Sequence, residues 1–267
     1  MPTQSKSIAA IAYLVALLRM NLKASLAQPV TSLIAAVMMF GNNLILFLIW
    51  VIYFARFSNI RGWVLQDLSL LLGVVAWGFG LTMLVAGGVR DLARTIVDGG
   101  LDVHLGRPRH PLPSLLISRS IPSGIGDMAS AFLFWLWLGQ RSLGELPLLI
   151  LVSTASAAVL CATLTITQCL VLWFPRAITL CEDLFNMLLM VAFYPQHPYG
   201  FTVRLVLFTV FPTAFISLVP VQAVRDRSGI AVMAMIFASA AYAFIALWIF
   251  NRGMRRYTSG NRVVELR

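Results

Sequence analysis

Acidic side chains within apolar stretches are the residues of this sequence with the clearest chemical implications. Glu182 and Asp183 lie near the start of one apolar stretch, and Asp127 lies near the start of another. Charges inside a bilayer are costly and survive mainly where they face protein or water. Glu182 and Asp183 therefore predict either a polar lining or gate, or a pair at headgroup level that is favoured by a helix dipole. Asp127 predicts a contact with a ligand headgroup, an ion pair with Arg119, or an interhelical hydrogen bond.

A catalytic or metal site is not predicted from the other reactive residues. The sequence has no GxSxG, HExxH or Walker A motif. Glu182 and Asp183 are adjacent, so on a helix they point about 100° apart and do not form a facing dyad. The three cysteines and three histidines are scattered and include no CxxC pair: Cys161, Cys169, Cys181, His104, His110 and His197. The series Thr163, Thr165, Thr167 and Gln168 either lines a path or bonds back to its own helix.

Composition places these residues in a membrane protein. Of 267 residues, 60% are apolar and 11% are charged, and the mean hydropathy is +0.87. A soluble domain is nearer a quarter charged, so composition argues against a soluble enzyme, a disordered chain and a nucleic-acid module. The net charge of +10 instead predicts cytoplasmic loops and attraction to anionic lipid headgroups.

The apolar runs predict an all-α integral membrane protein with one transmembrane domain over 1–267. A spanning helix needs roughly 20 mostly apolar residues. Six predicted spans are 31–54, 68–89, 121–138, 146–173, 178–194 and 230–250. The segment 7–27 is interrupted by basic residues and predicts an amphipathic helix lying in the membrane interface. The segment 201–219 contains Arg204 and Pro212 and stops at Pro220, which predicts a re-entrant helical hairpin between spans five and six.

Charge bias predicts that both termini are cytoplasmic. With six spans and a re-entrant 201–219, 14 of the 20 basic residues lie inside: Lys6, Arg19, Lys23, Arg90, Arg94, Arg107, Arg109, Arg119, Arg176, Arg252, Arg255, Arg256, Arg262 and Arg267. If 201–219 crossed fully, the five C-terminal arginines would move outside and the bias would nearly vanish. The loop 90–119 is then the largest cytoplasmic connection.

This loop has the pattern of a short amphipathic helix. Asp91 is placed to cap it, Leu92, Ile96 and Val97 form its apolar side, and Gly99-Gly100 ends it. A compact helix tied to two spans can dock in a groove of a soluble protein and transmit motion. A helix that merely covers a surface loop would have the same pattern.

Three ordered motifs resemble a known membrane-protein family. The pattern I-x-x-G-x-LD-x-x-L-x-x-P is matched by Thr95-Ile96-Val97-Asp98-Gly99-Gly100-Leu101-Asp102, then Leu105, Arg107 and Pro108. The pattern YP…Y…F…P…F…P is matched by Tyr194, Pro195, Tyr199, Phe208, Pro212, Phe215 and Pro220. The third match is Ile60-Arg61-Gly62-Trp63. Together they resemble the ABC-2 type transporter permeases, of the family formerly called domain of unknown function 990.

The resemblance implies a multi-pass permease subunit in a bacterial cytoplasmic membrane. It would pair with a second permease, identical or related, and with two ATP-binding subunits. ATP and Mg²⁺ are expected on those partners, and no cofactor or catalytic site is expected on this chain. The implied coupling residues are Asp91, Leu92, Arg94, Ile96, Val97, Asp98, Leu101 and Asp102. The segment 194–220 would form the outer gate region.

Three functional hypotheses follow. The first is an ATP-driven exporter subunit for a lipid-like, peptide or other amphiphilic cargo. The second is a secondary transporter without an ATPase, for which paired broken helices near the bilayer midplane are expected; the sequence shows one broken element. The third is an integral-membrane enzyme, which needs converging polar residues that the sequence does not show.

Overall fold

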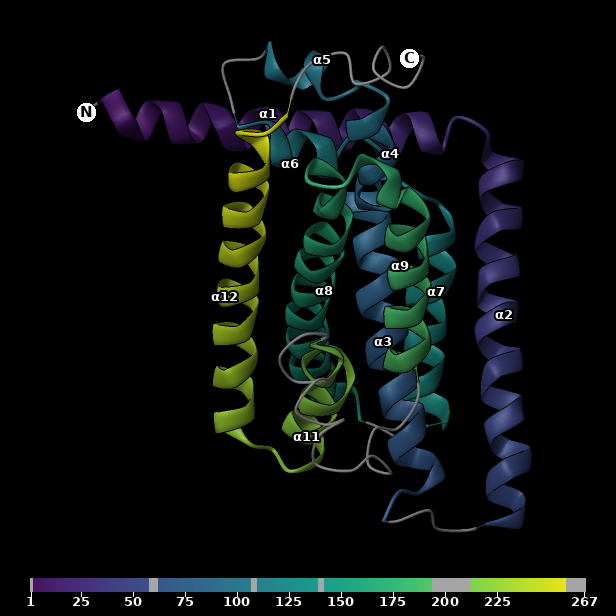
Figure 1. The fold of residues 1–267 in the computed structure, drawn as a ribbon. Helices are drawn as coiled ribbons and strands as arrows, with labels where there is room; N and C mark the ends of the chain where they lie inside the picture. The colour runs from purple at the N-terminus through teal and green to yellow at the C-terminus, as the bar shows by residue number, and fades with distance from the viewer. Residues whose placement is uncertain (1, 58–61, 107–109, 139–141, 194–211, 258–267) are drawn as a thin grey trace.

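The computed structural model describes residues 2–57, 62–106, 110–138, 142–193 and 212–257. Within these ranges the chain is almost entirely helical, and most of its long helices run side by side in a bundle (Figure 1). The elements, in chain order, are α1 (Pro2–Ser25), α2 (Pro29–Arg56), α3 (Leu65–Ala86), η1 (Gly87–Asp91), α4 (Leu92–Val97), α5 (Asp102–Leu105), α6 (Pro111–Leu116), α7 (Ser123–Phe132), η2 (Leu133–Leu138), η3 (Leu143–Glu145), α8 (Leu146–Gln168), η4 (Cys169–Leu172), η5 (Pro175–Ala177), α9 (Ile178–Ala192), η6 (Ala214–Leu218), α11 (Val219–Arg225) and α12 (Gly229–Met254).

Local sequence signals set several helix starts. Pro29 and Pro147 lie in the first turns of α2 and α8, where the missing proline N–H is not needed for an intrahelical bond. The Ser228 side chain caps α12 by accepting a hydrogen bond from the backbone N–H of Ala231 at 3.3 Å. These signals agree with the predicted starts of three spans to within a few residues.

Four of the predicted spans lie in helices that are long and apolar enough to cross a membrane. They are 31–54, 68–89, 146–173 and 230–250, which correspond to α2, α3 with the start of η1, α8 with η4, and α12. The predicted spans 121–138 and 178–194 correspond to shorter helical stretches, α7 with the π-helical η2, and α9. The membrane-protein prediction is thus supported, and the count of six spans stays a prediction.

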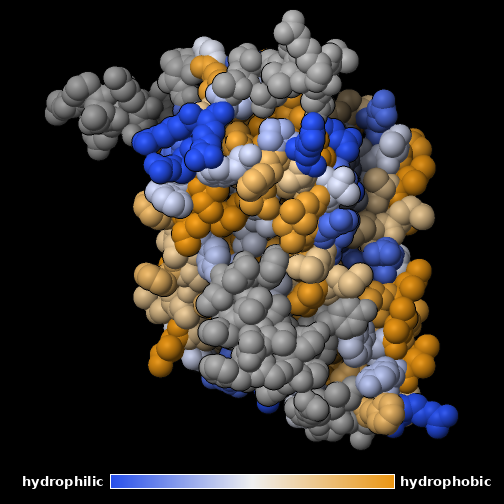
Figure 2. All heavy atoms as spheres, in the orientation of Figure 1, coloured by the Kyte–Doolittle hydropathy of each residue, from blue (hydrophilic) through white to orange (hydrophobic). Residues whose placement is uncertain are grey.

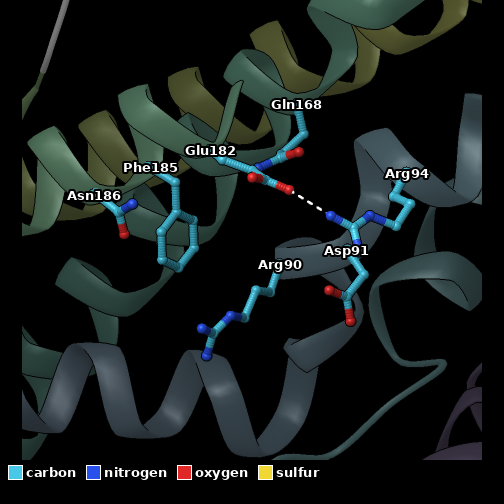
Figure 3. Close-up of a pocket in the computed structure, with 7 residues that line it drawn as sticks. All are labelled: Arg90, Asp91, Arg94, Gln168, Glu182, Phe185 and Asn186. Atoms are coloured by element: carbon cyan, nitrogen blue, oxygen red, sulfur yellow. Dashed lines mark hydrogen bonds and ion pairs between the residues drawn. The ribbon is translucent and has the colours of Figure 1, made fainter. Parts of the chain in front are cut away.

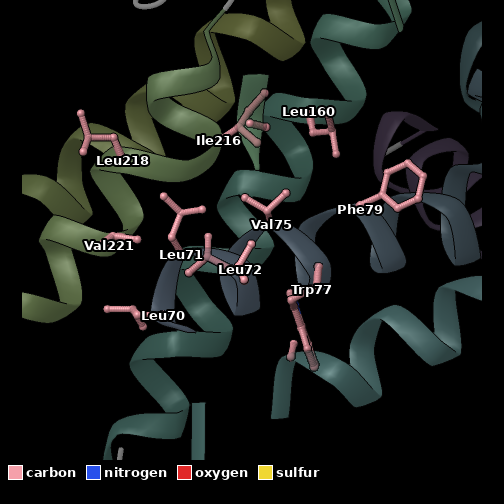
Figure 4. Close-up of a cluster of buried hydrophobic side chains, with 14 of the residues drawn as sticks. Leu70, Leu71, Leu72, Val75, Trp77, Phe79, Leu160, Ile216, Leu218 and Val221 are labelled. Carbon is pink, nitrogen blue, oxygen red and sulfur yellow. The ribbon is translucent and has the colours of Figure 1, made fainter. Parts of the chain in front are cut away.

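The helix α3 is the centre of the bundle. It packs against α7 and α8, and 83% of the residues in its most apolar window are buried. Figure 4 shows side chains of α3, including Leu71 and Val75, facing Leu160 of α8 and Ile216 of η6. A helix that is apolar on all sides is expected at such a position.

The helices α2 and α12 flank the bundle and expose most of their apolar side chains. Only 11% of the corresponding window of α2 and 17% of that of α12 are buried. Their outward side chains include Ile52, which is 70% exposed, and Phe237, which is 76% exposed. Figure 2 shows these apolar flanks in orange on both sides of the molecule. Surfaces of this kind are suited to lipid or to another membrane subunit.

The two ends of the bundle differ in what covers them. At one end, called here the α4–α6 end, α1 runs across the bundle and lies near α6 (Figure 1). The Asn21 side chain donates a hydrogen bond to the carbonyl of Ile117 at 2.6 Å and so ties α1 to this end. The opposite end, called the α11 end, holds the ion pairs Arg225–Asp67 at 3.5 Å and Arg227–Glu145 at 3.1 Å.

The predicted re-entrant segment is only partly within the described residues. Residues 201–211 lie outside them, whereas η6 and α11 form one helical run that continues to Arg225. The predicted stop at Pro220 is therefore wrong. Pro220 lies in the first turn of α11, directly after the π-helical η6, where a proline is tolerated. The Ser156 hydroxyl of α8 donates to the Ile216 carbonyl at 2.6 Å, which stabilises the irregular backbone of η6.

Candidate coupling region and polar pocket

The predicted coupling helix is a direct continuation of the central helix. From α3 the chain passes through η1 into α4 without a break, and the helical run ends at Val97. Gly99 has a φ of +78°, and the Gly100 N–H bonds to the Thr95 carbonyl at 2.9 Å. The prediction that Gly99-Gly100 ends this helix is confirmed, because a left-handed residue at that point is most readily supplied by glycine.

The apolar side of α4 is buried in the chain's own interior. Leu92 and Ile96 are 1% and 2% exposed, and Leu101, just after the helix, is fully buried. They belong to a second apolar cluster that also contains Cys169 of η4 and Phe250 of α12. This side is therefore unavailable for docking on another protein, contrary to the sequence-based expectation. An amphipathic pattern indicates that the apolar face of a helix is buried, but it does not identify which element buries that face.

The exposed part of the region is instead α5 and the polar side of α4. Val103 is 67% exposed and Leu105 is 43% exposed, and Arg94 and Asp98 are exposed as well. In Figure 1, α5 is the outermost labelled element at the α4–α6 end. A docking surface in this region is thus made by Val103 and Leu105, with charged residues beside them.

The remaining predicted coupling residues have intermediate positions. Val97 is half-buried and packs against the second apolar cluster. Asp102, in the first turn of α5, lies beside Tyr257, which follows α12. Burial and the neighbouring Asp102 carboxylate raise the pKa of Tyr257 to about 12. The loop therefore lies beside the end of the last helix.

Ion pairs link α4 and η1 to the rest of the bundle. Asp91 makes no capping hydrogen bond; its carboxylate pairs with Arg119 at 2.5 Å, so the predicted cap is wrong. Arg94 of α4 pairs with Glu182 of α9 at 2.8 Å. Asp183, the neighbour of Glu182, is exposed. The two acids thus have separate surroundings, as their adjacent positions on one helix predict.

A polar pocket opens where these ion pairs lie. Its volume is about 280 Å³. The lining residues are Arg90, Asp91, Arg94, Gln168, Glu182, Phe185 and Asn186, and Figure 3 shows them with the Arg94–Glu182 ion pair. The pocket therefore joins the coupling segment to α8 and α9. Glu182 lines this pocket at the end of the bundle, and its role as part of a polar lining or gate within the membrane stays a prediction.

Gln168 has a different role from the threonines that precede it. Its Oε1 accepts a hydrogen bond from the backbone N–H of Ala93 at 3.2 Å, so it holds α4 against α8. Thr163, Thr165 and Thr167 each donate to a carbonyl of their own helix, at 2.8 to 2.9 Å. Of the two readings of this polar series, bonding within the helix is confirmed for the threonines.

Asp127 takes part in an interhelical hydrogen bond. Its Oδ1 accepts from the Asn43 amide of α2 at 2.7 Å, and the same amide donates to Ser130 Oγ at 2.9 Å. Asp127 is fully buried. The predicted interhelical hydrogen bond is confirmed, and an ion pair with Arg119 is wrong because Arg119 binds Asp91.

The predicted outer gate residues are only partly described. Tyr194, Pro195, Tyr199 and Phe208 lie outside the described residues. Pro212 and Pro220 are buried, and Phe215 packs against the main apolar core at the α11 end. Their role as a gate stays a prediction.

Sequence reasoning did not predict five residues of these polar sites, which are Asn43, Arg90, Ser130, Phe185 and Asn186. Asn43 was detectable as a lone amide in the apolar run 31–54. Phe185 and Asn186 give no comparable signal, because only the packing of α9 beside η1 brings them to the pocket. Among the described residues, no group of three His, Cys, Asp or Glu side chains could hold a metal ion.

Comparison with known proteins gives one finding. The sequence profile of the family described as "ABC-2 family transporter protein" matches residues 36–261. No curated protein and no solved structure matches the chain. The matched region includes both the candidate coupling region and the polar pocket.

Proposed function

Because this chain belongs to the ABC-2 family of transporter proteins, we propose that it is the permease subunit of an ATP-driven exporter. Two ATP-binding subunits supply the hydrolysis of ATP with Mg²⁺, and a second permease, identical or related, completes the membrane path. The cargo is lipid-like, a peptide or another amphiphile. The complex lies in a bacterial cytoplasmic membrane.

In this proposal the α4–α6 end faces the cytoplasm. The described elements gathered there are α1, η1, α4, α5, α6, η5 and the end of α12, and ten of the 13 described basic residues lie in or close to them. The positive-inside bias favours this orientation. Six spans, formed by α2, α3, α7 with η2, α8, α9 and α12, return the C-terminus to the side of α1.

The observation that carries the proposal is the continuity of the coupling segment with α3. Displacement of α5 is transmitted along the chain to α4, which is joined to α3 by η1. The Ala93–Gln168 hydrogen bond holds α4 against α8. Because α3 is buried on nearly all sides, it transmits displacement to the helices packed around it. A small cytoplasmic contact is in this way connected to the centre of the bundle.

The exposed apolar residues of α5 provide the test. We expect the double substitution of Val103→Asp and Leu105→Asp to weaken binding of the ATP-binding subunits about tenfold or more, because apolar anchors dominate such contacts. Co-purification and cargo-stimulated ATPase activity measure the effect. Leu143→Asp is the matched control, since Leu143 is 73% exposed at the opposite end.

Two outcomes would contradict this proposal. Normal ATPase coupling in the α5 double variant would remove α5 from the contact. Transport of cargo by the purified chain alone would instead favour a secondary transporter. Ile96→Asp is unsuitable for this test because Ile96 is buried, and a charge there is expected to disrupt folding.

A further inference from the structure

Among the described residues, the polar pocket has one cation that is not paired with an acidic side chain. Two arginines, Arg90 and Arg94, and two acids, Asp91 and Glu182, line the pocket. Asp91 is paired with Arg119, which is not a lining residue, and Glu182 is paired with Arg94. Arg90 is exposed, and among the described residues it forms no ion pair. Its guanidinium lies 6.0 Å from the centre of the Phe185 ring. This aromatic contact orients the cation without cancelling its charge.

Amide donors lie in the same pocket wall. Gln168 is 1% exposed, and its Oε1 is used by Ala93, whereas its Nε2 has no hydrogen-bond acceptor among the described residues. A buried amide N–H without an acceptor is costly, so its position in a pocket wall indicates a missing acceptor. Asn186 adds a second, exposed amide on α9.

The donors and the unmatched charge together define the class of ligand. A guanidinium with neighbouring amide N–H groups binds the oxygens of a phosphate or carboxylate through charge-assisted hydrogen bonds. The volume of about 280 Å³ is slightly below the roughly 300 Å³ at which pockets for drug-sized ligands begin. The pocket therefore has room for a headgroup, while an attached acyl chain would have to lie outside it.

We propose that this pocket binds a phosphate or carboxylate group of an anionic amphiphile at the α4–α6 end. The assignment deepens the proposed function, on which it rests only for the role of the ligand as cargo. Arg90 supplies the charge, and Gln168 and Asn186 supply neutral donors. Because Gln168 also holds Ala93 of α4, ligand binding is communicated to the coupling segment.

Equilibrium binding to the purified full-length chain in a neutral detergent tests the site. Three probes are titrated calorimetrically: a short-chain phosphatidylglycerol, the matching phosphatidylcholine, and inorganic phosphate. We expect the phosphatidylglycerol to bind and the net-neutral phosphatidylcholine to bind at least tenfold more weakly. If inorganic phosphate displaces phosphatidylglycerol with an affinity similar to that of the lipid itself, the anion site would be assigned to a soluble ligand.

Two variants and a control identify the residues. Arg90→Gln is expected to weaken phosphatidylglycerol binding about tenfold or more. Gln168→Glu keeps the acceptor for Ala93 and replaces the free donor with a carboxylate, so it is also expected to weaken binding. Arg176→Gln is the matched control, because Arg176 is an exposed arginine of η5 that forms no ion pair among the described residues.

The outcomes separate this site from the wider proposal. Equal affinities for Arg90→Gln and Arg176→Gln would overturn the anion site. Binding that depends on Arg90 in a chain that recruits no ATP-binding subunit would support the site and contradict the exporter proposal. Binding that depends on Arg90, together with ATPase stimulation by phosphatidylglycerol in the complex, would support both.

Discussion

The acidic residues of the Asp127 cluster (Asn43, Asp127 and Ser130) and of the polar pocket have opposite surroundings. Asp127 lies inside the bundle and accepts a hydrogen bond from a neutral amide, that of Asn43 on the neighbouring helix. Glu182 lies at the α4–α6 end, half exposed, and pairs with the charged Arg94. The first acid joins α2 to α7, and the second borders an open space that contains an unmatched arginine.

The comparison distinguishes a structural polar site from one that can receive a ligand. An acid in an apolar interior needs donors fixed by close helix packing, and these leave no room for another molecule. At the end of the bundle, water screens the ion pairs, so residues there are free to exchange partners. Burial, rather than residue type, separates the two regions.

The largest expected effect concerns the close approach of α2 and α7 beside Asp127. A Cβ at Gly126 would collide with the carbonyl oxygen of Ala36. We expect Gly126→Val to destabilise the protein by about 3 kcal/mol, because backbone cannot move aside as a side chain can. Thermal unfolding in detergent measures the loss. Gly41→Ala on α2, where nothing lies within 4 Å, is the control and should be neutral or slightly stabilising.

A smaller loss of stability is expected from removing the Asn43 amide, which donates a hydrogen bond to Asp127. Asn43→Leu leaves a buried carboxylate oxygen without its donor, and we expect a cost of about 1–2 kcal/mol. Asn42→Leu is a matched control because Asn42 is the exposed neighbour. If both variants unfold at the same temperature, the Asn43–Asp127 bond does not stabilise the bundle and the structural role of this cluster is wrong.

The smallest effect on stability is expected at the polar pocket. Arg94 and Glu182 have side chains that are 63% and 50% exposed, so their ion pair is expected to contribute at most about 1 kcal/mol. A double-mutant cycle with Arg94→Gln and Glu182→Gln measures the coupling free energy. A value near that of a buried pair, about 3 kcal/mol or more, would show that the pair is shielded from water and that burial does not distinguish the polar pocket from the Asp127 site.

Much of the fold could be predicted because its signals are local. Apolar runs located α2, α3, α8 and α12, and the double glycine located the end of α4. The ends of α7 with η2, and those of α9, also lie within two residues of the predicted spans 121–138 and 178–194.

The candidate site was only partly predictable because its residues come from distant segments. Glu182 attracted attention as an acid near an apolar stretch, yet its partner Arg94 is 88 positions away. The amphipathic pattern of Leu92 and Ile96 predicted a face that docks on another protein, whereas this face is buried within the chain. Its cover proved to be η4, α12 and neighbouring residues of this chain, which periodicity does not specify.

Composition and hydrophobic periodicity by themselves determined that this is a helical membrane protein with a structured polar segment after its second long helix. Those properties depend on each residue's own transfer free energy and on helix geometry, so they can be read along the chain. Only the tertiary structure decided which face of that segment is exposed and which arginine of the polar pocket has no acidic partner among the described residues. Both depend on side chains from separate helices meeting in space, and one sequence does not encode those distances in any local pattern.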